Sequence, residues 1–222
     1  ITAGSAFGAM MGLAIHYLKA PPFIVTLTGL FLARGCCFLL TTESIPIRDP
    51  LYDAITGFGL GLPGGARLTA GAMVMIAAFI GGGVLLHGTR FGANVFAIGG
   101  EARAAGRMGA PVGRTTLGIY AFSGLCAALA GIVFSLYTGA GYPLAAMGIE
   151  LDAIAAVVIG GTLLTGGRGT IVGTVLGVLI FSTLTIIFTL NDRSFSEQQL
   201  LKGAIIVAAV LLQQRLASRS ST

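Results

Sequence analysis

The sequence has few charged residues, and this scarcity excludes most classes of protein. Only 9% of the 222 residues are Asp, Glu, Lys or Arg, 55% are hydrophobic, and the mean hydropathy is +0.93. Soluble domains carry about 25% charged residues, so 13 basic and 8 acidic side chains are too few to solvate a 22.5 kDa globule. The net charge of +5 forms no basic stripe, which argues against a nucleic-acid partner. The composition predicts a polytopic protein of the lipid bilayer.

Cysteines are also few, and catalytic motifs are missing. Cys36, Cys37 and Cys126 lie in apolar runs, which disfavours a disulfide framework or a zinc site. The sequence has no HExxH or GxSxG motif and no Ser/His/Asp set, so we predict neither catalytic nor metal-binding residues. Residues 161–168 start with the spacing of a phosphate-binding loop but lack its Lys and Ser/Thr. We therefore expect this chain to bind no ATP and no cofactor.

The chain begins at Ile1 within an apolar stretch. Neither a basic segment nor a cleavage site marks it as a signal peptide. We expect a fragment of a longer protein that lacks its N-terminal spans.

Seven apolar stretches have the length of a membrane span or nearly so, which takes about 20 residues. Pro21 and Pro22 separate the first two, because proline ends one helix and readily starts the next. The predicted fold class is all-α, a polytopic transmembrane helix bundle with about seven spans in one domain over 1–222. The expected spans are 1–18, 23–41, 69–87, 115–138, 151–165, 170–190 and 200–214.

The basic residues predict the orientation of these spans, because cytoplasmic loops carry an excess of Lys and Arg. Residues 88–114 hold four arginines and a single acid. Placing this loop inside puts the C-terminus in the cytoplasm, and residues 42–68 become the longest outer loop, with a short interfacial helix near 50–55. Eight basic residues then lie inside and four outside: Lys19, Arg90, Arg103, Arg107, Arg114, Arg168, Arg215 and Arg219 against Arg48, Arg67, Arg193 and Lys202.

Glycine is abundant, with 35 residues, and some of it is regularly spaced. Glycines four residues apart line one helix face and let two helix backbones approach closely in lipid. We interpret two such ladders as packing surfaces within the chain, with a dimerisation face as the alternative. Their members are Gly4, Gly8, Gly12, Gly169, Gly173 and Gly177.

Two charged residues lie within or at the start of expected spans. Arg34 is about seven residues, or ~10 Å, from the outer end of its span. Such a residue can snorkel, pair with another group, or line a substrate pathway. Asp152 opens the fifth span, where it either complements the helix dipole or contributes to a polar outer vestibule.

A short cytoplasmic helix is predicted within residues 99–109. Gly109 and Pro111 follow it as stop signals. A solvated connector is the alternative that the residues alone leave open. The pairs four apart on common faces are Glu101 with Ala105, Arg103 with Arg107, and Ala104 with Met108.

Several segments together carry a family resemblance. They are 22–27, 90–92, 97–102, 108–109, 123–125, 129–131, 150–162, 166–170 and 173–174. As a set they resemble the permease subunits of bacterial sugar ABC importers, the ribose/xylose/galactofuranose group. Segments 43–47 and 137–142 look closest to the galactofuranose member.

The resemblance implies a non-enzymatic pore for a galactofuranose- or ribose-like monosaccharide in the bacterial inner membrane. It implies three kinds of partner: a cytoplasmic ATPase that carries ATP-Mg, a second permease subunit in a homo- or heterodimer, and a periplasmic sugar-binding protein. Residues 88–114 would be the coupling loop that docks on the ATPase. The implied coupling residues are Gly100, Glu101, Ala102, Arg103, Ala104, Ala105, Arg107, Met108 and Gly109, and the pathway candidates are Arg34, Tyr142 and Asp152.

Three other functions remain open. A branched-chain amino-acid ABC permease has the same architecture with another substrate. An ion-coupled secondary transporter would need acids within the membrane or matching broken helices, and no acid lies at the centre of an expected span. A membrane scaffold without transport has no motif in its favour.

Overall fold

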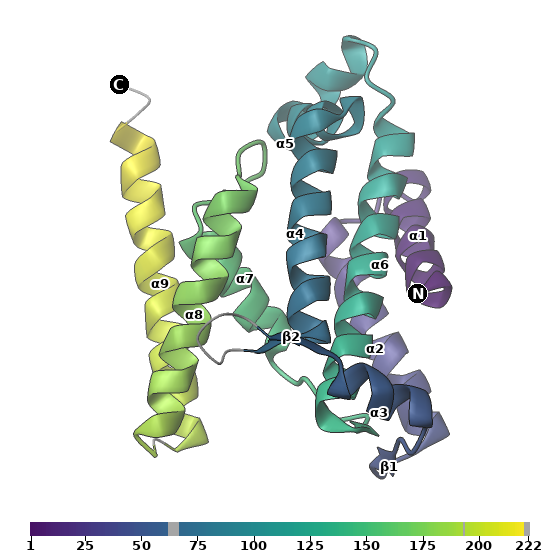
Figure 1. Ribbon diagram of the computed structural model, residues 1–222. Coiled ribbons are helices and arrows are strands. Elements are labelled where there is room, and N and C mark those ends of the chain that lie inside the picture. Colours follow the sequence, from purple (N-terminus) through teal and green to yellow (C-terminus); the bar gives the residue numbers. More distant parts are fainter. Residues whose placement is uncertain (62–66, 193, 220–222) are drawn as a thin grey trace. The chain divides into compact units, whose positions relative to one another are not determined.

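A computed structural model describes residues 1–61, 67–192 and 194–219, and the chain is mostly helical (Figure 1). The prediction of a mainly α-helical fold is confirmed. Residues 62–66 of the expected outer loop, and Arg193, lie outside the described residues. The helices are α1 Thr2–Tyr17, α2 Pro22–Leu40, α3 Pro50–Gly57, α4 Ala70–Gly88, α5 Arg90–Arg107, α6 Val112–Thr138, α7 Ile149–Ile159, α8 Ile171–Leu190 and α9 Phe195–Arg219.

Four of these helices, α2, α4, α6 and α8, are long and apolar enough to cross a membrane, counted over the described residues. Helix α1 has 16 residues and α7 has 11. The total of seven spans therefore stays a prediction. The predicted extent of the fifth span, 151–165, is wrong at its C-terminal end. Helix α7 stops at Ile159 because Gly160 and Gly161 follow, and Gly161 takes a φ of +85° that favours glycine.

The chain forms two compact units. Unit 1 holds residues 1–95 and 106–145, and unit 2 holds 96–105 and 146–222. Helix α5 contributes residues to both.

In unit 1, α1 packs against α6 along the first glycine ladder. A Cβ built on Gly4 would lie 2.6 Å from the Cβ of Ala128, and one on Gly12 would lie 3.1 Å from the Cα of Leu117. A Cβ on Gly8 would overlap the carbonyl oxygen of Tyr120. The two helices run antiparallel and touch through their backbones, which only glycine permits at these positions.

The predicted outer loop contains a helix and short strands. Helix α3 lies where a short helix was expected, and its N-cap Asp49 accepts a hydrogen bond from the amide of Leu51 at 2.8 Å. The Tyr52 hydroxyl and Ser135 Oγ are 3.2 Å apart, which ties α3 to the end of α6. The strands were not predicted, because pieces of two or three residues carry no periodic pattern. They are β1 Ile45–Pro46, β2 Gly59–Gly61, β3 Arg67–Thr69 and β4 Ala140–Gly141, with β1 pairing β4 and β2 pairing β3.

In unit 2, α7 and α8 pack along the second glycine ladder. Gly173 faces the carbonyl group of Gly160, and Gly177 faces that of Ala156. Gly169, just before α8, lies against the side chain of Thr162. Ala155, Ala156 and Phe181 form a small buried cluster beside this contact. The close approach of α7 and α8 is therefore again a contact between backbones.

Candidate functional site

The predicted coupling segment is a helix interrupted at one residue. Helix α5 starts at Arg90, earlier than predicted, after Thr89 Oγ1 accepts a hydrogen bond from the Gly92 amide at 3.3 Å. Glu101 has φ −153° and ψ 98°, so the short helix predicted within residues 99–109 is present but starts only after Glu101. Its carboxylate accepts a hydrogen bond from the amide of Arg103 at 3.3 Å. Glu101 therefore acts as an N-cap that starts a second helical segment, residues 102–107.

We call residues 101–109 the tip. Its helical segment ends where the Gly109 amide donates to the Gly106 carbonyl at 3.1 Å, with Gly109 at φ +86°. Ala105 is 2% exposed, whereas Met108 is 79% exposed. Every other predicted coupling residue, including Gly100, is exposed. The tip thus exposes two arginines and a methionine close together in the chain, residue types suited to docking in the groove of a partner protein.

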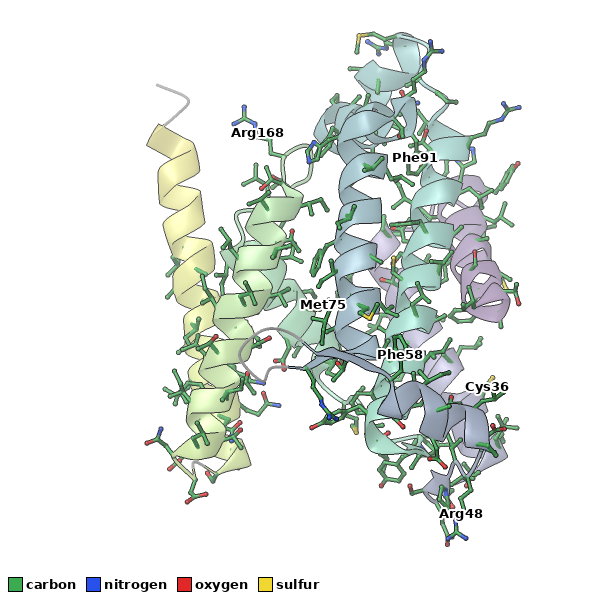
Figure 2. All side chains as sticks on the ribbon, in the orientation of Figure 1. Cys36, Arg48, Phe58, Met75, Phe91 and Arg168 are labelled. Carbon is green, nitrogen blue, oxygen red and sulfur yellow. The ribbon has the colours of Figure 1, made fainter. Side chains whose placement is uncertain are left out.

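Within unit 2, the two residues just before the tip lie against the turn between α7 and α8. A Cβ on Gly99 would lie 2.8 Å from the amide nitrogen of Gly167, and a Cβ on Gly167 would lie 2.9 Å from the Cα of Gly100. Arg168 projects from this turn (Figure 2). The sequence showed glycines here but not that two distant glycine pairs meet.

An ion pair joins α7 to α9 in unit 2. Lys202 Nζ lies 2.7 Å from Asp152 Oδ2, and the two side chains are 14% and 31% exposed respectively. The ammonium group also lies 5.3 Å from the centroid of the Phe181 ring, within the range of a cation–π interaction. Lys202 was expected at the outer end of its span, but α9 begins at Phe195, so it lies two turns inside the helix. From the sequence, Lys202 was counted only as an outer basic residue, and its acidic partner was not predicted.

The other two pathway candidates lie in unit 1. Arg34 is half-buried in α2, and no hydrogen bond or ion pair joins its side chain to another described residue. Tyr142 follows β4, is 44% exposed, and accepts a hydrogen bond from the Ala145 amide at its carbonyl. Within the described part of the chain, no hydrogen bond joins Arg34 to Tyr142.

The described ranges 1–61, 67–192 and 194–219 contain no group of three or more His, Cys, Asp or Glu residues that could hold a metal ion. Cys36 and Cys37 are free and exposed, and Cys126 is free and half-buried.

The sequence of this chain is similar to one known family and to several known proteins. Residues 1–210 match the family described as the branched-chain amino acid transport system / permease component. The inner membrane ABC transporter permease protein YjfF of Escherichia coli K12 is 55% identical over 177 residues, covering 80% of this chain and 54% of the relative. The ribose import permease protein RbsC of Bacillus subtilis 168 is 40% identical over 207 residues, covering 92% and 63%. The L-arabinose transport system permease protein AraH of Escherichia coli K12 is 35% identical over 206 residues, covering 91% and 61%.

The chain thus spans between about half and two thirds of the length of these curated relatives. No solved structure matches it significantly.

Proposed function

Because the chain belongs to the family of permease components of branched-chain amino acid transport systems, we propose that it forms the membrane pathway of an ATP-driven monosaccharide importer. The observation that carries the proposal is the exposed tip, residues 101–109, in a chain whose relatives include a ribose and an L-arabinose permease. The substrate is a monosaccharide of the ribose or galactofuranose kind. The permease itself is not an enzyme, and ATP-Mg binds to a separate ATPase subunit.

The proposed topology has seven spans in this chain, the tip in the cytoplasm, and the C-terminus inside. Two contacts within unit 1 support it. In unit 1, His16 packs on Gly113 at the start of α6, whereas the Ile47 amide bonds to the Gly139 carbonyl at the other end of α6. The end of α1 and the segment around Ile47 therefore lie at opposite ends of α6, an arrangement that agrees with the orientation predicted from the charges. The segment 42–68 is then an outer loop.

In the proposed mechanism the tip docks on a cytoplasmic ATPase. Arg103 and Arg107 offer charge and Met108 offers an adaptable apolar contact. ATP-driven movement of the ATPase displaces the tip and shifts the pathway between outward and inward access. A second permease subunit completes the pathway, and a periplasmic binding protein delivers the sugar. Arg34, Tyr142 and Asp152 stay candidates for contacts along the pathway.

The test uses the full-length permease reconstituted with its ATPase and binding protein. Reversing both charges of the tip, Arg103→Glu with Arg107→Glu, should lower ATPase stimulation by loaded binding protein at least about fivefold, a normal size for coupling between sites. The matched control is Arg48→Glu, a charge reversal at an exposed position in the predicted outer loop. Equal stimulation in both variants would contradict the coupling role.

Uptake by the same proteoliposomes tests the substrate. Labelled ribose or galactofuranose should accumulate only with ATP inside. Accumulation of leucine in place of sugar would support a branched-chain amino-acid permease. Uptake that survives without ATP but disappears with the ion gradient would support a secondary transporter.

A further inference from the structure

The contact between residues 99–100, just before the tip, and the turn at 166–167 consists almost entirely of backbone. We call Gly99, Gly100, Gly166 and Gly167 the glycine contact. A Cβ on Gly99 would lie 2.8 Å from the Gly167 nitrogen and 3.7 Å from the carbonyl carbon of Gly166. A Cβ on Gly166 would lie 2.5 Å from the Gly99 carbonyl oxygen. Two chain segments more than sixty residues apart therefore meet with no side chain between them.

Two hydrogen bonds close the turn on the far side of this contact. The Leu163 amide donates to the Arg168 carbonyl at 3.1 Å, and the Gly166 amide donates to the Leu163 carbonyl at 3.0 Å. Gly166 and Gly167 have φ values of +90° and +77°, which L side chains rarely adopt. The turn is thus a hydrogen-bonded piece of structure that leads directly into α7 and α8.

Beyond the turn, α7 and α8 are joined by the same kind of contact. Gly160 and Gly173 face one another through backbone atoms, and Gly177 faces the Ala156 carbonyl. Thr170 Oγ1 accepts a hydrogen bond from the Gly173 amide at 3.1 Å, which fixes the start of α8. A continuous series of backbone contacts therefore runs from Gly99 to the body of α8, within unit 2. A side chain can absorb a displacement by changing rotamer, whereas packed backbone cannot.

We propose that the glycine contact transmits movement of the tip to helices α7 and α8, with Gly99 as a positioning residue for the coupling step. This inference rests on the proposed function, in which the ATPase displaces the tip. It adds the route by which the displacement reaches the helices of unit 2. Residues 96–105 belong to the same compact unit as residues 146–222, so this route runs within unit 2.

The test adds one methyl group at the contact. Gly99→Ala forces the tip and the turn apart, so uptake and ATPase stimulation by loaded binding protein should fall at least about fivefold. The matched control is Gly81→Ala, another helical glycine, where a Cβ would meet no atom within 4 Å. Both changes raise helix propensity equally, and the control should keep stimulation within about twofold of the unmodified protein.

The outcomes separate the two proposals. If Gly99→Ala behaves like Gly81→Ala while Arg103→Glu with Arg107→Glu loses stimulation, the transmission route is overturned and the proposed function stands. If the tip reversal also has no effect, the proposed function falls as well.

A second measurement covers the case in which Gly99→Ala does not assemble. Hydrogen exchange is followed in the unmodified complex with and without trapped nucleotide. The amides of Leu163 and Gly166, both bonded within the turn, should change exchange rate together with those of residues 102–107. A change confined to 102–107, or no change in either segment, would overturn the route.

Discussion

Removing one partner of the Asp152–Lys202 ion pair should destabilise the protein substantially. Lys202→Met keeps the length of the side chain and leaves the Asp152 carboxylate without its partner at 2.7 Å. Removing one member of a buried ion pair costs about 3–5 kcal/mol. Because Asp152 keeps 31% of its side chain exposed, water screens part of the charge, and we expect a cost below that range, about 2–3 kcal/mol. Loss of the ammonium group from the Phe181 ring adds about 0.5–1 kcal/mol.

The measurement is the free energy of unfolding of the full-length permease in mixed micelles, as a double-mutant cycle. Asp152→Leu with Lys202→Met removes both charges, so it should be less destabilising than Lys202→Met alone by at least about 1 kcal/mol. Lys19→Met is the control, an exposed lysine outside the helices that should change stability by less than about 0.5 kcal/mol. The single variant Asp152→Leu completes the cycle. If the loss of stability in the double variant equals the sum of the losses in Lys202→Met and Asp152→Leu, a stabilising interaction between the two groups is refuted.

Two further changes probe unit 1. Gly8→Ala places a methyl group against the Tyr120 carbonyl and should lower the free energy of unfolding by about 1–3 kcal/mol. The control Gly131→Ala, where a Cβ would meet nothing within 4 Å, should be neutral or slightly stabilising. Equal free energies of unfolding for the two variants would argue against backbone packing of α1 on α6. Tyr52→Phe removes the hydroxyl that bonds to Ser135 Oγ, which is worth about 1 kcal/mol. Limited proteolysis within 42–61 should then be roughly fivefold faster, and an unchanged rate would mean that this bond does not hold α3 in place.

Strong local signals explain why several helices could be predicted closely. The second span was expected at 23–41 and α2 is Pro22–Leu40, because Pro22 marks the first turn of a helix. The sixth was expected at 170–190 and α8 is Ile171–Leu190, with Thr170 as its N-cap. The spacing of Gly4, Gly8 and Gly12 predicted a packing face. It could not identify α6 as the partner, because periodicity within one helix says nothing about the helix that covers it.

Nonlocal features could not be predicted in the same way. Asp152 and Lys202 are 50 residues apart, and the pair depends on how α7 meets α9. The break at Glu101 escaped prediction because pairs four apart look alike in a continuous helix and in one that restarts. The meeting of Gly99 with Gly167 depends on a turn that the sequence shows only as a group of glycines.

The backbone contact between α1 and α6 has a consequence for how the protein is made. Gly4 and the Gly124 region that covers it are 120 residues apart in the chain. At about 5–20 residues per second, the ribosome adds that length in roughly 6–24 s. Throughout this interval α1 has no α6 to fill its glycine face. A nascent chain stalled before Val112 should therefore recruit membrane chaperones at α1, and release them once α6 has been synthesised and inserted.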